Sequence, residues 1–148
     1  MAELGRRNVM ATAFAGNVEK IDLLAYKDKR TRALQVKAWR SGTAGVDAKK
    51  YINITQDGDR QIVTGIDVSL DSDLIFVFVQ IGESLGKDNF YLLKQRDLQH
   101  LIEDGYTAYL NKHGGIRPRN PLSTHSSVTL EQLTRYKDDW SFIDESWI

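Results

Sequence analysis

The sequence predicts an α/β (α+β) protein with a central mixed β-sheet flanked by helices. Residues 74–81 are apolar at almost every position, as expected for a strand that is buried on both faces at the centre of a sheet. Residues 20–39 contain two apolar runs joined by a charged turn, which is the pattern of a β-hairpin. From residue 95 onward apolar side chains recur at helical spacing.

Strands are expected over residues 8–14, 20–26, 32–39, 51–55, 61–68, 73–82 and 89–94. Turns are expected at residues 15–17, 27–30, 57–58 and 82–86, where glycine, asparagine or charged residues interrupt the apolar pattern. Residues 41–50 and 117–127 are polar, or contain the prolines, and are predicted to be connections. The most clearly defined of these units is the hairpin that turns at residues 27–30.

Helices are expected over residues 1–7, 96–112 and 129–140. The second has apolar residues at helical spacing and ends at Gly114, with a possible break near Gly105. The third starts with Thr129 as N-cap and Gln132 in the capping-box position. The aromatic side chains that follow are expected to pack back on the sheet, with a dimer interface as the alternative; they are Tyr136, Trp140, Phe142 and Trp147.

The composition is that of a globular protein with a packed core. The chain has 148 residues, of which 41% are hydrophobic and 27% charged, and we expect one domain over residues 1–148. It has no cysteine, which excludes disulfides, thiolate catalysis and Cys-ligated metal centres and predicts a cytoplasmic location. No apolar run is long enough to span a bilayer, and the N-terminus lacks the apolar region of a signal peptide.

Three polar residues interrupt the hairpin and define the candidate site. Centring the turn between residues 28 and 29 places Asp22 directly opposite Gln35, with Cβ atoms roughly 5 Å apart. Lys37 lies on the same face as Gln35, because side chains alternate along a strand. Leu34, Val36 and Ala38 are then expected to face the core. The hairpin therefore displays an acid, an amide and a lysine together.

This combination suits a hard cation. A carboxylate oxygen of Asp22, the amide oxygen of Gln35 and the main-chain carbonyl of Val36 are ligands that Mg²⁺ or Mn²⁺ accepts, with water completing the coordination. Lys37 beside them is suited to orient or deprotonate an attacking water. The simpler alternative is a cross-strand salt bridge between Asp22 and Lys37, which predicts no metal.

The order of Asp22, a hairpin and then Gln35, Val36 and Lys37 resembles the metal-binding core of the PD-(D/E)XK nuclease superfamily. This superfamily includes restriction endonucleases and Holliday-junction resolvases. The likeness covers about residues 1–55 and is greatest to small prokaryotic members with the order helix, strand, aspartate, strand, "QVK".

The resemblance implies a restriction-endonuclease-like fold and specific roles. Asp22 and Gln35 would bind the metal together with the Val36 carbonyl, and Lys37 would assist the nucleophile, so that Asp22, Gln35 and Lys37 are the catalytic residues. Gln35 stands where an acid is common, which removes one negative ligand charge. For the glutamate that the family often supplies from its first helix, the sequence offers only Glu3.

The charge distribution adds a nucleic-acid hypothesis. Residues 1–50 contain 11 Lys and Arg against 5 Asp and Glu, although the whole chain has a net charge of zero. Arg7, Lys20, Lys49 and Lys50 are the residues expected to contact a DNA backbone, although a solvated basic surface is the alternative reading. Lys20 faces Lys37 in the predicted register, and two like charges in this position favour an anion between them.

The function that these patterns predict is a metal-dependent endonuclease, an Mg²⁺-dependent deoxyribonuclease, that hydrolyses DNA phosphodiester bonds. A homodimer would suit an enzyme that cuts two strands. The alternative is a catalytically degraded module of the same fold that binds nucleic acid or a protein partner. The three histidines show no zinc-ligand spacing, and no phosphate-binding glycine loop or serine-hydrolase motif occurs.

Overall fold

The computed structural model describes residues 1–15 and 20–145. Its strands are β1 (Met10–Ala13), β2 (Leu23–Lys27), β3 (Arg30–Trp39), β4 (Ala44–Asp47), β5 (Ile52–Asp57), β6 (Arg60–Ile66), β7 (Ile75–Gln80), β8 (Asn89–Lys94) and β9 (His125–Val128). Its helices are α1 (Ala2–Arg6), α2 (Gln95–Lys112), α3 (Leu130–Leu133) and α4 (Ser141–Asp144), with 3₁₀ turns η1 (Ala48–Lys50) and η2 (Thr134–Tyr136). None of the helices in this part of the chain has the length and hydropathy needed to cross a membrane.

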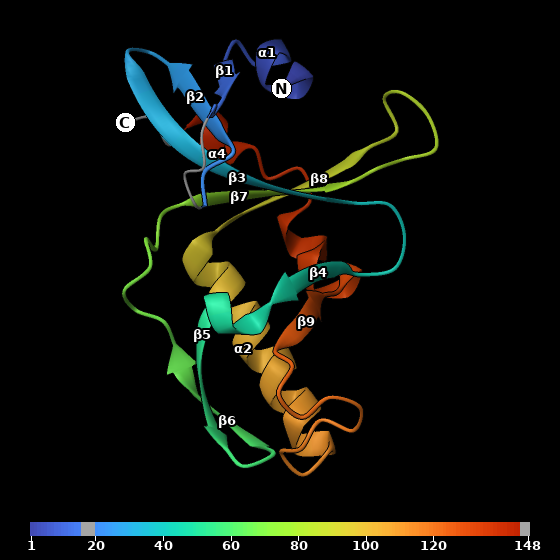
Figure 1. Cartoon of the computed structure of the whole chain (residues 1–148). Helices are drawn as coiled ribbons and strands as arrows, with labels where there is room; N and C mark the ends of the chain where they lie inside the picture. Colours follow the sequence, from blue (N-terminus) through green and yellow to red (C-terminus); the bar gives the residue numbers. More distant parts are fainter. Residues whose placement is uncertain (16–19, 146–148) are drawn as a thin grey trace.

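A five-stranded mixed sheet organises the fold. Its strand order is β1-β2-β3-β7-β8, in which β3 and β7 are parallel and the other neighbours are antiparallel. The predicted α+β class with a central mixed sheet is therefore confirmed, and β7 is an interior strand as its apolar sequence predicted (Figure 1). Two further two-stranded units, β4 with β9 and β5 with β6, lie beyond one face of this sheet.

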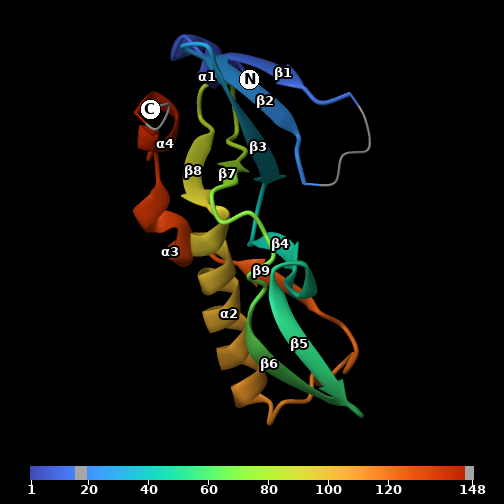
Figure 2. The same cartoon turned by 90° about the vertical axis from the view of Figure 1, so that its left-hand side faces the viewer.

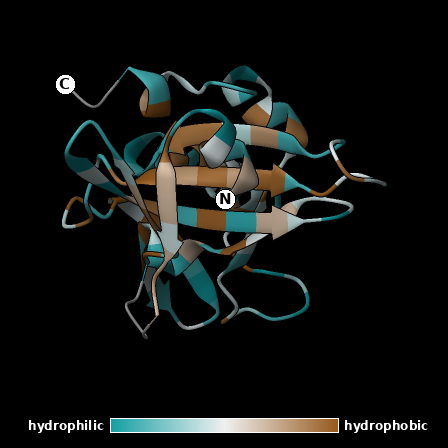
Figure 3. Cartoon of the chain, turned by 90° about the horizontal axis from the view of Figure 1, so that it is seen from above, coloured by the Kyte–Doolittle hydropathy of each residue, from teal (hydrophilic) through white to brown (hydrophobic). Residues whose placement is uncertain are grey.

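Both faces of the sheet are covered by hydrophobic groups. Along β7, Phe76 and Phe78 belong to the core shared with α2, while Ile75 and Val77 belong to a second core that includes Leu4 of α1. Alternation of side chains along the strand explains this division. Accordingly α1 and α2 lie on opposite sides of the sheet in Figure 1, and the sheet strands seen from above are largely hydrophobic (Figure 3).

The β2–β3 hairpin has the predicted register. Asp28 and Lys29 form its two-residue turn with positive φ angles of 50° and 64°, as a type I′ turn requires. Leu23 pairs with Leu34, and Lys27 pairs with Arg30. Regular pairing begins only at Leu23, so the first residues of the predicted strand 20–26 precede β2.

Helix α2 spans residues 95–112 without interruption, so the break considered near Gly105 does not occur. A Cβ at Gly105 would lie 3.3 Å from the side-chain nitrogen of Gln132, which explains why a small residue suits this contact between α2 and α3. The helix ends before Gly114 and Gly115, which have φ angles of 64° and 83°. It runs alongside β5 and β6 (Figure 2).

Two strands lie in segments predicted to be connections. β4 falls within residues 41–50 and pairs with β9, most of which falls within residues 117–127. Their buried side chains include Val46 and Val128, and each strand has only four residues. Such a short strand has too few positions to show a period, and only its partner identifies it.

Other local predictions have mixed outcomes. Ala38, expected to face the core, is exposed. The capping box of Thr129 and Gln132 is present, and Tyr136, Trp140 and Phe142 pack against the two cores. Trp147 and most of the predicted turn at residues 15–17 lie outside the described residues.

Candidate active site beside a lysine-lined cavity

Asp22 is held at the entrance to β2 by both its main chain and its side chain. Its N–H donates to the carbonyl of Leu34 over 2.9 Å, and its carbonyl accepts from the N–H of Phe14 over 3.0 Å. Its Oδ2 accepts two further bonds of 2.7 Å, one from Nε2 of Gln35 and one from the main-chain N–H of Val36. The carboxylate is thereby directed at β3, while Oδ1 takes part in neither bond.

Gln35 and Lys37 lie on the face of β3 that is directed at α2. In the parallel pairing, Gln35 is level with Phe76 and Lys37 with Phe78, and both phenylalanines belong to the core shared with α2. The predicted proximity of Asp22 and Gln35 is present. Within the described residues, Asp22 forms no ion pair with Lys37, so the simple salt-bridge alternative does not describe this contact.

Only one of the two polar atoms of the Gln35 amide forms a hydrogen bond within the described residues. Its Nε2 donates to Asp22, whereas its Oε1 is buried and accepts no hydrogen bond from the residues that the structure describes. A buried carbonyl oxygen without a partner is costly, commonly about 1–3 kcal/mol. This oxygen is therefore a position where a cation, a water or a charged donor would be stabilising.

A small cavity of about 140 Å³ opens beside this amide. Three lysines line it: Lys37 from β3, Lys50 from η1 and Lys20 from the segment before β2. Gln35, Tyr51, Phe76 and Gln95 complete its wall. Residues separated by up to 75 positions in the chain therefore form one cationic recess, which we call the lysine cavity.

The other wall residues are held in place by packing and hydrogen bonds. The Tyr51 ring lies 5.9 Å from that of Phe76, and burial, with Asp47 nearby, raises the pKa of Tyr51 to about 12. The Tyr51 hydroxyl thus remains a hydrogen-bond donor at neutral pH. Gln95 is buried and donates from Nε2 to the carbonyl of Asp71 over 2.5 Å.

The described residues separate the predicted basic positions into two groups. Lys20 and Lys50 line the lysine cavity together with Lys37, whereas Lys49 does not line it; Lys20, Lys49 and Lys50 are all exposed residues. Arg7 lies on the other side of the sheet, 2.8 Å from Asp144 and stacked over Trp140 at 4.1 Å. Arg7 is therefore not part of one binding surface with the lysines.

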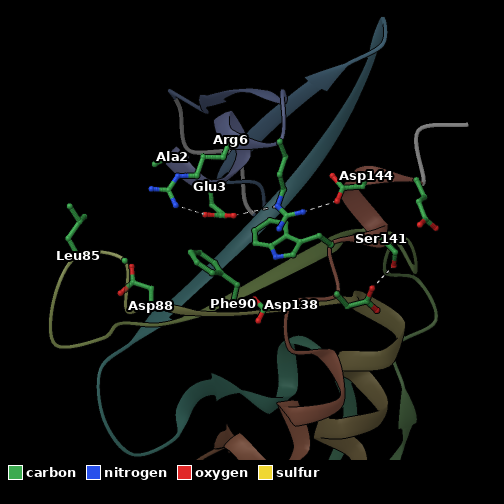
Figure 4. A pocket seen from close by; sticks show the side chains of 14 residues that line it. Ala2, Glu3, Arg6, Leu85, Asp88, Phe90, Asp138, Ser141 and Asp144 are labelled. Carbon is green, nitrogen blue, oxygen red and sulfur yellow. Dashed lines mark hydrogen bonds and ion pairs between the residues drawn. The ribbon is translucent and has the colours of Figure 1, made fainter.

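Glu3, the only glutamate available in the first helix, is also remote from Asp22. It pairs with Arg6 and Arg7 at 3.6 Å and lines a pocket with Phe90 and Asp144 (Figure 4). That pocket lies on the side of the second core. The structure thus leaves Asp22 as the acid of the candidate site, and no group of three His, Cys, Asp or Glu side chains suited to a metal occurs in the described part of the chain.

The oxygen ligands available at this site fit one particular kind of metal site. Mg²⁺ in proteins often uses only one or two carboxylates and takes its other ligands from water and from substrate phosphates. Asp22 and the unpartnered Oε1 of Gln35 match that pattern, and the nearby ammonium groups favour a phosphate. They do not match a cage built from protein ligands alone.

Tyr51 and Gln95 were missing from the predicted site. The secondary-structure pattern already accounts for both residues, since Tyr51 begins an alternating strand and Gln95 begins the long helix. The only sequence signal for Tyr51 is its position directly after Lys49 and Lys50. Their approach to Gln35 depends on the packing of α2 against β7 and β8 and of η1 against α2.

No protein-family model matches the chain, and no curated protein matches it. Among solved structures it is similar to a bacterial homing endonuclease, I-Ssp6803I, with 16% sequence identity and a TM-score of 0.41. The matched region covers 67% of this chain and 64% of that chain, so this chain spans just under two thirds of that protein's length. At this level of similarity a shared activity does not follow.

Proposed function

We propose that the protein is a nuclease-like enzyme that hydrolyses phosphodiester bonds in DNA with the help of a divalent cation, Mg²⁺ or Mn²⁺. The observation that supports this most directly is the contact between Asp22 and Gln35, with Lys37 on the same face of β3 and a cationic cavity beside it. The order of these three residues resembles the PD-(D/E)XK superfamily, which agrees with the same proposal.

Each residue has a chemical role in this proposal. The carboxylate of Asp22 and Oε1 of Gln35 would hold the cation, with the Val36 carbonyl as a further oxygen ligand. When bound, the cation supplies Lewis-acid polarisation of the phosphate. The ammonium of Lys37 orients the attacking water and stabilises the negative charge that develops on the phosphoryl oxygens.

Nicking of supercoiled plasmid in Mg²⁺ or Mn²⁺ tests the proposal. The wild-type protein should convert supercoiled to open-circular DNA, and Asp22→Asn and Lys37→Ala should each abolish this conversion. Asp28→Asn is the matched control, because it removes a carboxylate from the turn of the same hairpin. Absence of nicking by the wild type in both metals, or equal nicking by Asp22→Asn, would contradict the proposal.

The second candidate is a non-catalytic module that binds nucleic acid through the same face. It is favoured by the single carboxylate at the site and by the neutral Gln35 beside it, because both weaken cation binding. This candidate predicts salt-sensitive DNA binding in the presence of a chelator, without cleavage in either metal. The nicking experiment separates it from the enzyme.

A further inference from the structure

We infer that the lysine cavity binds one phosphate group, using the ammonium groups of Lys20, Lys37 and Lys50. This inference deepens the proposed function and rests on it for the choice of DNA as the source of the phosphate. The cavity itself is observed independently of any reaction, and its volume of about 140 Å³ is sufficient for a single phosphate group.

The positive charges of the three lysines favour binding of an anion in the cavity. Lys20 and Lys37 line the same small recess, although Lys20 precedes the regular pairing of β2 with β3, and like charges in one recess repel. Within the described residues, neither Lys37 nor Lys50 forms an ion pair with an acid. An anion in the recess that these three lysines line would reduce the repulsion between them.

The acids near the cavity compensate these charges only in part. Asp22 is turned toward Gln35 and the Val36 N–H, where it already accepts two bonds. The pKa of Asp67 is lowered by hydrogen bonds from Ser69 and, to a smaller degree, by the charge of Lys20, which places Lys20 near this carboxylate. Asp47 lies near Tyr51 and accepts a bond of 2.5 Å from the hydroxyl of Thr124.

The backbone at Lys20 is also unusual. This lysine has a φ of 79°, a conformation that side-chain-bearing residues seldom adopt and that surrounding structure must stabilise. It places the Lys20 side chain at the cavity although the residue precedes the regular part of β2. Tyr51, whose raised pKa keeps its hydroxyl neutral at neutral pH, also lines the cavity.

Phosphate binding in the presence of a chelator tests this inference without any need for catalysis. Isothermal titration with inorganic phosphate should show binding to the wild type and about tenfold weaker binding to Lys50→Ala, as expected for loss of one charge-assisted hydrogen bond. Lys112→Ala, which removes an exposed lysine at the far end of α2, should bind phosphate as the wild type does. Lys49→Ala should lose far less affinity than Lys50→Ala.

A competition experiment identifies the source of the phosphate. If the source is DNA, inorganic phosphate should displace a short duplex, and Lys50→Ala should reduce the slope of log affinity against log salt by about 0.9. If phosphate binds in a Lys50-dependent manner without displacing the duplex, the cavity serves a free phosphate or a small phosphoester instead. The cavity assignment is overturned if the wild type binds no phosphate, or if Lys50→Ala and Lys112→Ala bind it equally.

These outcomes are distinct from those of the nicking assay. If the wild type binds phosphate in a Lys50-dependent manner but cuts no DNA, the phosphate-binding cavity is supported and the enzyme proposal is contradicted. If the wild type cuts DNA but shows no Lys50-dependent phosphate binding, the enzyme proposal is supported and the phosphate-binding cavity is contradicted.

Discussion

Nε2 of Gln35 donates a hydrogen bond of 2.7 Å to Oδ2 of Asp22, and the same oxygen accepts the main-chain N–H of Val36. This arrangement gives Asp22 two roles. It is the anionic ligand of the proposed cation site, and its side-chain hydrogen bonds also connect the start of β2 to β3. Substitutions at this position therefore affect both stability and activity, and the two effects need separate measurements.

Asp22→Ala should reduce the free energy of unfolding by about 1 kcal/mol, because the N–H of Val36 and the amide of Gln35 both lose their acceptor. Asp22→Asn retains a side-chain oxygen and should lose less. Urea denaturation in the presence of a chelator measures both variants. Equal stability of Asp22→Ala and the wild type would show that these two bonds contribute nothing to folding.

Gln35→Glu should strengthen binding of a divalent cation, because it adds the carboxylate that the site lacks. Without metal, two neighbouring carboxylates repel, so the melting temperature of this variant should lie below that of the wild type at neutral pH. Mn²⁺ should then raise the melting temperature more for Gln35→Glu than for the wild type. Gln35→Met, which has no oxygen ligand, is the control and should show less response than the wild type.

A wild-type response to Mn²⁺ that is unchanged in both Gln35→Glu and Gln35→Met would remove Gln35 from the cation site. Thermal unfolding followed by circular dichroism, with and without the metal, is sufficient for this comparison.

Tyr51→Phe should make stability less sensitive to alkaline pH. The pKa of Tyr51 is raised from 10.0 to about 12 in the folded protein, so its neutral form stabilises the fold fully below pH 10. Between pH 10 and 12 the unfolded chain loses this proton before the folded protein does, and stability falls by up to about 3 kcal/mol. Phenylalanine retains the ring contact with Phe76 and removes the ionisation.

The measurement is the free energy of unfolding of the wild type and of Tyr51→Phe as pH rises from 9 toward 11. Both proteins have the same lysines, so the difference between their slopes reports Tyr51 alone. Tyr26→Phe, in which an exposed tyrosine is changed, should retain the wild-type slope. Identical slopes for Tyr51→Phe and the wild type would mean that burial of the Tyr51 hydroxyl does not oppose its ionisation.

Gln99→Leu should destabilise the protein by about 2 kcal/mol, because the buried amide of Gln99 donates to the carbonyls of Tyr51 and Asp67 over 2.8 and 2.7 Å. These bonds connect α2 to the segments that carry one wall of the lysine cavity. His100→Ala, at the exposed neighbouring position, should change stability little. Urea unfolding tests both variants, and equal stability of Gln99→Leu and the wild type would contradict this role.

The local part of the candidate site was predictable from the sequence. The hairpin turn at Asp28 and Lys29 sets the register, and the register alone places Asp22 beside Gln35 and puts Lys37 on the same face. The period of two along the strands and the helical period after residue 95 likewise predicted the sheet and α2. Such patterns are visible because neighbours in the chain determine them.

The rest depended on contacts between distant segments. β4 and β9 were missed because each is too short to show a period, and the sequence grouped Arg7 with lysines that lie across the sheet from it. The cavity likewise requires Lys50 and Tyr51 to approach Gln35, which depends on the packing of η1 against α2 and of Tyr51 against Phe76 of β7. The sequence by itself determined the hairpin, the central strand and the pairing of Asp22 with Gln35, since turn geometry and side-chain alternation act locally. Only the tertiary structure decided which basic residues share a site, because burial of apolar faces brings together residues that no sequence spacing connects.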